Sequence, residues 1–418
     1  MAGNDSQLSR RSALKVAGGA VVAGGVTVGA MGKGGSDGRD VIVGLEADAS
    51  PDVAASKADS VKRTMDFGNV GTAVAGKFSE EAIKGLQKTR DVRYVEEDGS
   101  MHALHHRDGH DGGPGGGDDG GSTSQCLPWG IDRTDSEVAH ANGETGNGAT
   151  IAIIDTGIDS DHPDLQGNIN TSLSKAWVKC KGGSCNYPWD DDNDHGTHCA
   201  GTADAIDNSQ GVVGVSHSAD LVALKVLDKR GSGSFSDIAA AIEYCGDNSD
   251  RIDVGSMSLG ASSGSQSVKD ACTYADNQGV LLVAAAGNDG PCSDCVGYPA
   301  AYSECVAVSS TNDSDNLSSF SSTGPEVEIA APGTDVYSTI PGGYDTFSGT
   351  SMATPHVAGA AGQLMANGAS NDNARSTLKN NAENIGLASN ESGAGLLDTA
   401  AALGLDSSDD GGTAGNCG

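Results

Sequence analysis

The chain has 418 residues, and its 57 Asp and Glu against 25 Lys and Arg give it a formal net charge of −32. Large apolar side chains are scarce, since Leu, Ile, Val and Phe together number 72. Low apolar content combined with high net charge is the compositional signature of a disordered chain. Either this chain does not fold, or its few apolar residues are concentrated where they form a core.

The negative charge lies mainly in the larger, C-terminal part of the chain. Residues 124–418 contain 39 acidic and 11 basic residues, whereas residues 1–123 contain 18 and 14. Such a surface repels phosphate groups, which excludes nucleic acid as a partner. It also repels itself, and salt screens that repulsion because the Debye length falls from ~10 Å at 0.1 M to ~3 Å at 1 M. We interpret the acidity as adaptation to a very salty medium; the alternative is an ordinary acidic secreted protein.

The first 35 residues are typical of an export signal. The pair Arg10 and Arg11 precedes a mildly apolar stretch, residues 16–31, that is rich in Gly and Ala. This stretch falls short of the ~20 strongly apolar residues that a membrane span requires. A paired arginine before such a stretch indicates the twin-arginine route. We therefore expect a secreted, extracellular protein without a stable membrane anchor, a permanent anchor being the alternative.

Residues 40–106 are predicted to form a small α+β unit. Strand-like runs at 41–45 and 92–96 enclose a short helical segment at 79–86, for which Ser79 is the predicted N-cap. Residues 107–123 are rich in Gly and Asp. Such a composition cannot bury a core, so it predicts a flexible linker.

From residue 124 to residue 406 the pattern changes to buried strands and Ala-rich helices. Continuous apolar runs at 149–154, 221–226 and 280–284 suit parallel strands that are buried on both faces. Segments 236–245 and 267–277 are the predicted helices between them. This pattern predicts an α/β fold with a doubly wound parallel sheet flanked by helices. Residues 407–418 are predicted to be a flexible tail.

Three segments of this region contain residue types that together support nucleophilic catalysis. Asp155 ends the first predicted strand, His195 lies at a predicted helix start, and Ser351 precedes an Ala-rich helix. A serine hydroxyl needs a base to take its proton. Histidine is such a base, and a carboxylate on its other ring nitrogen holds it in the required tautomer. Taken singly, the three are also explained as a turn residue, an incidental histidine and an N-cap.

With these motifs the sequence resembles the subtilisin-like serine proteases (subtilases, peptidase family S8) over most of residues 125–405. The resemblance implies that Asp155 orients His195, that His195 is the general base and acid, and that Ser351 is the nucleophile. It also implies that the Asn288 side-chain amide donates to the oxyanion, with the Ser351 main-chain N–H as the second donor. Pro355 would disrupt an ordinary helix, but the family tolerates a proline there. The chain most resembles the extracellular proteases of halophilic archaea (halolysins).

The resemblance also implies a substrate cleft. Segments 229–233 and 258–261 resemble the two strands that enclose an extended peptide, which implies main-chain recognition with loose side-chain selectivity. Gly297 resembles the position that leaves the primary pocket open, so we expect cleavage after large apolar residues. Asp289 near that pocket implies some tolerance of basic residues, the alternative being a surface acid. The implied substrate-binding residues are Gly231, Ser232, Gly233, Ser258, Leu259, Gly260, Ala285, Gly287, Asp289 and Gly297.

Residues 40–106 resemble a subtilase propeptide of the ferredoxin-like, inhibitor I9 type. This implies a zymogen whose propeptide acts as intramolecular chaperone and inhibitor. The corresponding cut falls between residues 104 and 106. Because the linker follows, we also expect a second trim around residues 122–125.

The resemblance further implies one structural Ca²⁺ ion. Loop 206–212 resembles the family's binding loop, and an all-oxygen set of six ligands suits Ca²⁺. An ordinary turn is the alternative. The acidic run at 190–194 is interpreted as a solvated loop rather than a second cation site. The implied calcium ligands are the side chains of Gln125, Asp164 and Asn208 and the carbonyls of Ile206, Gln210 and Val212.

The chain has ten cysteines, and an exported chain can form disulfides. Cys180 with Cys185, and Cys292 with Cys295, are the best local pairs. The alternative for these short pairs is a zinc site. We also consider a pair between Cys245 and Cys272 and expect Cys199 to be a buried free thiol; the sequence assigns no partner to Cys126, Cys305 or Cys417.

These observations predict a secreted, salt-adapted serine endopeptidase that acts on proteins or peptides through an acyl-enzyme. We expect it to be made as a zymogen and to be a monomer. The alternative is a non-catalytic cell-surface or peptide-binding relative, which the intact set of three motifs disfavours.

Overall fold

The fold is that of a computed structural model, which describes residues 38–105, 125–182, 185–407 and 417. The predicted export signal at 1–35 and linker at 107–123 lie outside the described residues, as does most of the predicted tail at 407–418. From Gly38 onward, the described residues belong to one compact unit. Within the described ranges, no helix is both long and apolar enough to span a bilayer.

The N-terminal part is an antiparallel sheet with short helices. Among the described residues this sheet has four strands in the order β2-β3-β1-β4. Helix α2 begins after Ser79, whose side chain accepts a hydrogen bond from the Ala82 N–H at 3.2 Å, as the sequence predicted. The elements are β1 (Arg39–Leu45), α1 (Asp52–Ala55), β2 (Ser60–Asp66), a 3-10 turn (Gly68–Val70), β3 (Thr72–Phe78), α2 (Glu80–Leu86) and β4 (Val92–Glu97).

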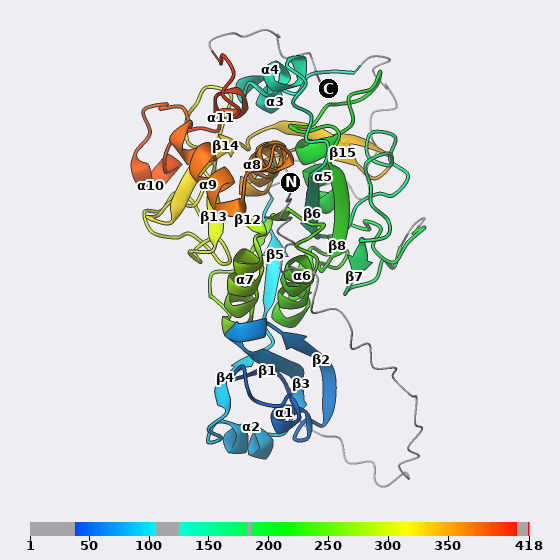
Figure 1. The fold of residues 1–418 in the computed structure, drawn as a ribbon, viewed down its shortest axis with the longest axis vertical. Coiled ribbons are helices and arrows are strands. Elements are labelled where there is room, and N and C mark those ends of the chain that lie inside the picture. The colour runs from blue at the N-terminus through cyan, green and yellow to red at the C-terminus, as the bar shows by residue number, and fades with distance from the viewer. Residues whose placement is uncertain (1–37, 106–124, 183–184, 408–416, 418) are drawn as a thin grey trace, which may run out of the picture. The chain divides into compact units, whose positions relative to one another are not determined.

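The main domain is built on a parallel sheet (Figure 1). In the part of the chain that the structure describes, this sheet has seven strands in the order β14-β13-β12-β10-β6-β8-β7. All its pairings are parallel. The three predicted strands are among them, within two residues of the predicted bounds. The strands are β6 (Thr150–Asp155), β7 (Lys175–Ala176), β8 (Asp220–Lys225), β10 (Val254–Met257), β12 (Leu281–Ala285), β13 (Cys305–Thr311) and β14 (Val327–Pro332).

Helices cover both faces of this sheet, with α5 and α8 on one side and α6 and α7 on the other (Figure 1). Strand β6 shows why both faces are buried. Ile151 and Ile153 belong to the core cluster that contains α5 and α8 residues, while Ala152 and Ile154 belong to the cluster with α6 and α7 residues. Successive strand residues point to opposite faces, so the doubly wound α/β fold is confirmed. The helices of the main domain are α3 (Trp129–Arg133), α4 (Ser136–Ala141), α5 (His195–Asp204), α6 (Phe235–Asp247), α7 (Gln266–Gln278), α8 (Thr350–Ala366), α9 (Asn371–Asn380), α10 (Ser389–Ser392) and α11 (Thr399–Ala402).

Small residues allow these layers to pack closely, which resolves the conflict posed by the composition. Helix α8 is rich in Ala and Gly and is buried throughout residues 350–364, with Pro355 inside it. A Cβ at Gly359 would lie 2.7 Å from Cβ of Val215. The core is therefore made of many small apolar residues rather than a few large ones.

Shorter strands complete the fold. Strands β15 (Val336–Ile340) and β16 (Gly343–Phe347) form an antiparallel hairpin ahead of α8. A separate small sheet contains β5 (Ser100–Ala103), β9 (Ser232–Ser234) and β11 (Leu259–Gly260).

The disulfides agree with the sequence analysis in part. Cys180 is bonded to Cys185 and Cys292 to Cys295, as predicted, and Cys126 is bonded to Cys417. The suggested pair between Cys245 and Cys272 is wrong. Both are free and buried, because α7 turns Cys272 toward the first residue of β13, Cys305, whose sulfur lies 3.9 Å away.

Candidate active site

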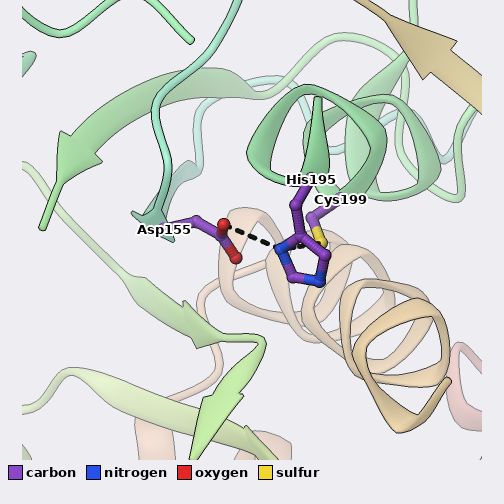
Figure 2. A group of neighbouring side chains, drawn as sticks. All are labelled: Asp155, His195 and Cys199. Atoms are coloured by element: carbon purple, nitrogen blue, oxygen red, sulfur yellow. Dashed lines mark hydrogen bonds and ion pairs between the residues drawn. The ribbon is translucent and has the colours of Figure 1, made fainter. Parts of the chain in front are cut away.

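A histidine and a carboxylate meet where β6 ends and α5 begins. Nδ1 of His195 lies 2.8 Å from Oδ1 of Asp155, and both side chains are fully buried (Figure 2). The Thr156 N–H donates to the same Asp155 oxygen at 2.6 Å. The Thr156 hydroxyl oxygen accepts from the Gly196 N–H at 2.8 Å, which ties the strand end to the first turn of the helix.

The environment of His195 suits a base. Burial lowers the pKa of His195, but the neighbouring Asp155 carboxylate raises it, and the net pKa lies well above the ordinary value for histidine. Among the described residues Nε2 has no hydrogen-bond partner. The sulfur of Cys199 lies 4.0 Å from Nδ1 and is free and buried, as predicted (Figure 2). Burial raises the pKa of the Cys199 thiol, which keeps it protonated.

Ser351 is the second residue of α8, and Ser258 fixes its position. The Ser351 hydroxyl donates to the carbonyl of Ser258 at 2.9 Å, and the Ser258 hydroxyl donates to the carbonyl of Ser351 at 2.8 Å. The Cys199 sulfur also lies 3.5 Å from the Ser351 carbonyl oxygen. Helix α8 is thereby held against both α5 and the segment between β10 and β11.

Asn288 follows β12 and is oriented by α8. Its Oδ1 accepts from the N–H of Thr350 at 3.0 Å and from the Thr350 hydroxyl at 2.9 Å. These two bonds engage the amide oxygen and not the side-chain NH₂. A Cβ at Gly349 would lie 3.2 Å from Asn288 Nδ2 and 2.5 Å from the carbonyl oxygen of Leu104. The Asn288 amide and the Leu104 carbonyl therefore both lie beside Gly349.

Residues 100–104 occupy the cleft that the sequence predicted for substrate. Strand β5 lies between β9 and β11 and is antiparallel to both. The pairing continues past the strand, because the N–H of Ala103 donates to the Gly231 carbonyl at 2.9 Å and that of Leu104 to the Ser258 carbonyl at 3.3 Å. The two predicted cleft segments thus enclose an extended stretch of the chain itself.

The next residues reach the histidine. The ring of His105 lies 4.9 Å from the ring of His195 and 5.5 Å from that of Phe347, centroid to centroid. A Cβ at Gly260 would lie 2.9 Å from Cδ1 of Leu104. The peptide bond between Leu104 and His105 therefore lies beside Gly349, close to His195 and Asn288. The Ser258 carbonyl that accepts from the Leu104 N–H also accepts from the Ser351 hydroxyl.

Comparison with known proteins agrees with this geometry. The model of the subtilase family matches residues 146–399, most of the chain. This chain belongs to the subtilase family. Subtilisin E of Bacillus subtilis (strain 168) is 40% identical over 317 residues, 75% of each chain. Alkaline protease of Shouchella clausii is 40% identical over 332 residues, 78% of this chain and 77% of the relative. Subtilisin Savinase of Lederbergia lenta is 44% identical over 286 residues, 67% of this chain and 99% of the relative. The protein is accordingly a subtilisin-like serine protease.

Among the other predicted substrate-binding residues of this subtilase, Gly297 lies against the segment that follows β11, and Gly287 lies beside Gly297. The Gly297 N–H donates to the Ala286 carbonyl at 2.8 Å, and a Cβ at Gly297 would lie 3.1 Å from the carbonyl oxygen of Ala261, just beyond β11. Ala285 ends β12, and Gly287 follows with φ of 120°. Asp289 is exposed, and its N–H donates to the Ser322 hydroxyl at 3.1 Å.

The predicted calcium ligands of the subtilase converge on one loop. Nε2 of Gln125 lies 2.8 Å from the Ile206 carbonyl and 3.0 Å from the Val212 carbonyl. Asp164 is buried and accepts from the Asn208 amide and from the Val212 N–H, each at 3.0 Å. The sixth predicted ligand, Gln210, contributes its N–H, which donates to Asn208 Oδ1 at 2.7 Å.

These residues fit a calcium ion. Carbonyl, carboxylate and amide oxygens are the ligands that Ca²⁺ prefers, and a side-chain amide turned about its last bond presents oxygen in place of nitrogen. The loop is also shaped around the carboxylate, since a Cβ at Gly211 would lie 2.0 Å from Asp164 Oδ2. The Tyr344 hydroxyl donates to the same oxygen at 2.9 Å.

The interpretation of residues 190–194 as a solvated loop is wrong. Asp190 is 3% and Asp191 9% exposed; Asp190 accepts from a main-chain N–H that precedes the run, and Asp191 accepts from one within it. Asp191 also accepts from the N–H and hydroxyl of Thr197, at 3.0 and 2.7 Å. Asp192 is paired with the buried Lys225. Carboxylates in a run of like charges are normally exposed to solvent. Here hydrogen-bond donors and one lysine compensate their charge, so they can be buried.

Two carboxylates that the sequence analysis missed connect the N-terminal part to the main domain. Glu96 accepts from the N–H groups of Gln266 and Ser267, at 2.8 and 2.9 Å, where α7 begins. Asp98 accepts from the N–H and hydroxyl of Ser236, at 2.9 and 2.7 Å, where α6 begins. A negative charge at a helix N-terminus is stabilising, so each carboxylate acts as a cap supplied from another part of the chain.

Ion pairs strengthen the same contact. Arg93 lies 2.8 Å from Asp270 of α7, and Lys62 lies 3.1 Å from Asp237 of α6. Their partners lie more than 170 residues away along the chain, so no local sequence signal could have indicated them.

Proposed function

We propose that this subtilase is a secreted, salt-adapted serine endopeptidase that hydrolyses peptide bonds through an acyl-enzyme. The observation that carries the proposal is the position of the peptide bond between Leu104 and His105. Its residues lie against His195 and Asn288 while the preceding strand is held between two cleft strands. This is the arrangement that a peptide substrate needs.

In the proposed mechanism Asp155, His195 and Ser351 form the catalytic triad. The Ser351 hydroxyl attacks the substrate carbonyl carbon while Nε2 of His195 takes its proton. The oxyanion receives hydrogen bonds from the Asn288 amide and the Ser351 N–H. His195 then donates its proton to the leaving amine, and water cleaves the acyl-enzyme with His195 as base. The hydrogen bond to Asp155 supports the orienting role. The role of base is supported by Nε2, which has no hydrogen-bond partner within the described part of the chain.

We propose that substrates bind as extended strands between residues 231–233 and 258–260. The antiparallel pairing of β5 with β9 and β11 supports main-chain recognition. Ala285, Gly287 and Gly297 would line the primary pocket, and Leu104, whose side chain lies beside Gly260, would be an example of a large apolar occupant. In this proposal the exposed Asp289 gives some tolerance of basic side chains.

We propose that residues 40–106 are an inhibitor I9-like propeptide and that the chain is a zymogen. The occupied cleft and the caps from Glu96 and Asp98 support an inhibitory and folding role. Cleavage would fall near residues 104–106, followed by a trim near residues 122–125, leaving residues 124–406 as the catalytic domain.

We propose one structural Ca²⁺ ion, held by the side chains of Gln125, Asp164 and Asn208 and by main-chain carbonyls of Ile206, Gln210 and Val212. When bound, the ion would join residue 125 to loop 206–212 and so stabilise the fold; it takes no part in the chemistry. The convergence of five of these residues supports the site.

We propose export by the twin-arginine route, directed by residues 1–35, and a halolysin-like, extracellular, monomeric enzyme. The arginine pair and the charge of residues 124–418 support this.

A single assay tests the activity: the wild type and the Ser351→Ala variant are purified in molar NaCl and compared on casein. We expect hydrolysis by the wild type alone. Equal activity of the two, or none in the wild type, would contradict the proposal and favour a non-catalytic relative.

A further inference from the structure

Lys225, the last residue of β8, is fully buried although it carries a charge. Its ammonium donates to Asp192 Oδ1 at 2.6 Å, to the Leu227 carbonyl at 3.1 Å and to the Thr156 carbonyl. An ammonium has three N–H donors, so each one is used. Burying such a group is costly unless its charge is compensated, and an apolar residue would fill a strand position without that cost.

The position of Lys225 relates it to the catalytic carboxylate. In the parallel pairing of β6 with β8, Asp155 lies opposite Lys225. The carbonyl that Lys225 binds belongs to Thr156, the residue after Asp155, and the Thr156 hydroxyl in turn accepts from the Gly196 N–H of α5. The ammonium therefore fixes the backbone at the end of β6, directly after Asp155.

The other end of the pair belongs to the loop that leads into His195. Asp192 is three residues ahead of His195, and its second oxygen accepts from the Lys181 N–H at 2.8 Å. Directly before His195, Asp194 has φ of 117°, a conformation that residues with a Cβ avoid. Such a conformation persists only where the surrounding contacts hold the chain in place. The bond from Asp192 to Lys225 is one of these contacts.

We propose that Lys225 and Asp192 are a positioning pair for the triad. The pair fixes the strand end that carries Asp155 relative to the loop that carries His195, and so maintains the bond between them. This inference rests on the proposed function, but it assigns the pair no contact with substrate. Their side chains are 0% and 5% exposed, and salt screens a buried pair far less than an exposed one. The pair thus keeps its strength in a medium that weakens surface ion pairs.

The test compares variants of the full chain on a peptide substrate. Lys225→Met with Asp192→Leu removes both charges, and a buried pair replaced by apolar residues is often tolerated by the fold. Asp192→Asn keeps the shape and one acceptor oxygen. The matched control is Lys269→Met, which removes an exposed lysine of α7. Unfolding temperature, kcat and KM are measured at about 1 M and about 3 M NaCl. At both concentrations the screening of exposed charges is nearly complete.

We expect the control to match the wild type. Both pair variants should remain folded and lose on the order of tenfold or more in kcat, because small displacements of catalytic groups are costly. KM should stay within about twofold, and the loss should be the same at both salt concentrations. A wild-type kcat in the folded pair variants overturns the inference, as does a failure of both to fold, since the pair would then serve the fold alone. An inactive wild type would instead contradict the proposed function.

Discussion

Thr350 orients the Asn288 amide through two hydrogen bonds to its oxygen, so the NH₂ group beside Gly349 cannot exchange places with the oxygen without the loss of both bonds. A donor that is held in place before the reaction stabilises the developing oxyanion without reorganisation. We expect Asn288→Ala to lower kcat by about 10²–10³ with little change in KM. Steady-state kinetics on a peptide substrate measure this. An unchanged kcat would show that the amide does not serve the oxyanion.

The ionisation of His195 determines how activity depends on pH. Burial lowers the pKa of His195, but the Asp155 carboxylate raises it, and the net pKa lies above the ordinary histidine value. The neutral imidazole is the base, so kcat/KM should rise with pH through an inflection above the ordinary value of about 6.5. Asp155→Asn removes the charge that raises this pKa, so the inflection of its residual activity should move to lower pH. A pH-independent rate between about pH 5 and 8 would contradict this assignment.

Helices α6 and α7 each receive a cap from the N-terminal part of the chain. An N-cap contributes about 1 kcal/mol, and a carboxylate also interacts favourably with the helix dipole. In the unprocessed Ser351→Ala background, we expect Glu96→Ala to lower the free energy of unfolding by about 1 kcal/mol or more. Denaturant unfolding measures it, with Glu46→Ala, at an exposed site, as control. If both variants unfold alike, Glu96 is not a cap that matters for stability.

The loop at residues 206–212 and the segment at Gln125 are the elements that calcium would join. A ligand that binds only the folded state stabilises it by about 3 kcal/mol at a concentration about 100 times its Kd. A chelator should therefore lower the unfolding temperature of the wild type but not of Asp164→Asn, which lacks one ligand charge. Calorimetry at the lowest NaCl concentration that keeps the chain folded tests this. Equal unfolding temperatures of the wild type with and without chelator would exclude the site.

The buried strands and the short motifs were predictable because their signals are local. The apolar run at 149–154 identifies a buried strand without knowledge of its neighbours, and β6 is the result. Asp155 and His195 each lie at the boundary of an element, where a side chain is presented to a neighbouring segment. The sequence therefore predicted both the sheet and the close approach of these two side chains.

Contacts between distant segments were not predictable in the same way. The acidic run at 190–194 has the composition of a solvated loop, and only the fold places Thr197 and Lys225 where they compensate it. Lys225 itself stands in an apolar run, and a charge in such a run is the one available sign that it has a buried partner. Glu96 caps helix α7 although Gln266, at the start of that helix, lies 170 residues further along the chain. Such pairings depend on how the elements pack, which no local pattern contains.

The net negative charge of the main domain opposes the folding of that domain. Residues 124–418 carry a net charge of −28, the difference between 39 acidic and 11 basic residues. The core that opposes this repulsion consists largely of small side chains, and each contributes less than a large one because stabilisation follows the apolar area buried. Repulsion between surface carboxylates is long-ranged at low salt and short-ranged at high salt. The balance should therefore depend on salt concentration far more than it does in a neutral protein.

We expect the enzyme to lose activity and folded structure on dialysis to ~0.05 M NaCl, where screening is weak. Circular dichroism and casein hydrolysis, followed along a NaCl titration, measure the midpoint of the loss. The triple variant Asp250→Asn, Asp294→Asn and Asp313→Asn removes three exposed charges and should shift that midpoint to lower salt. Because these side chains lie outside the proposed catalytic machinery, the variant should match the wild type in molar NaCl. Full activity of the wild type in ~0.05 M NaCl would mean that the core outweighs the repulsion without screening, and that the acidic surface is not an adaptation to salt.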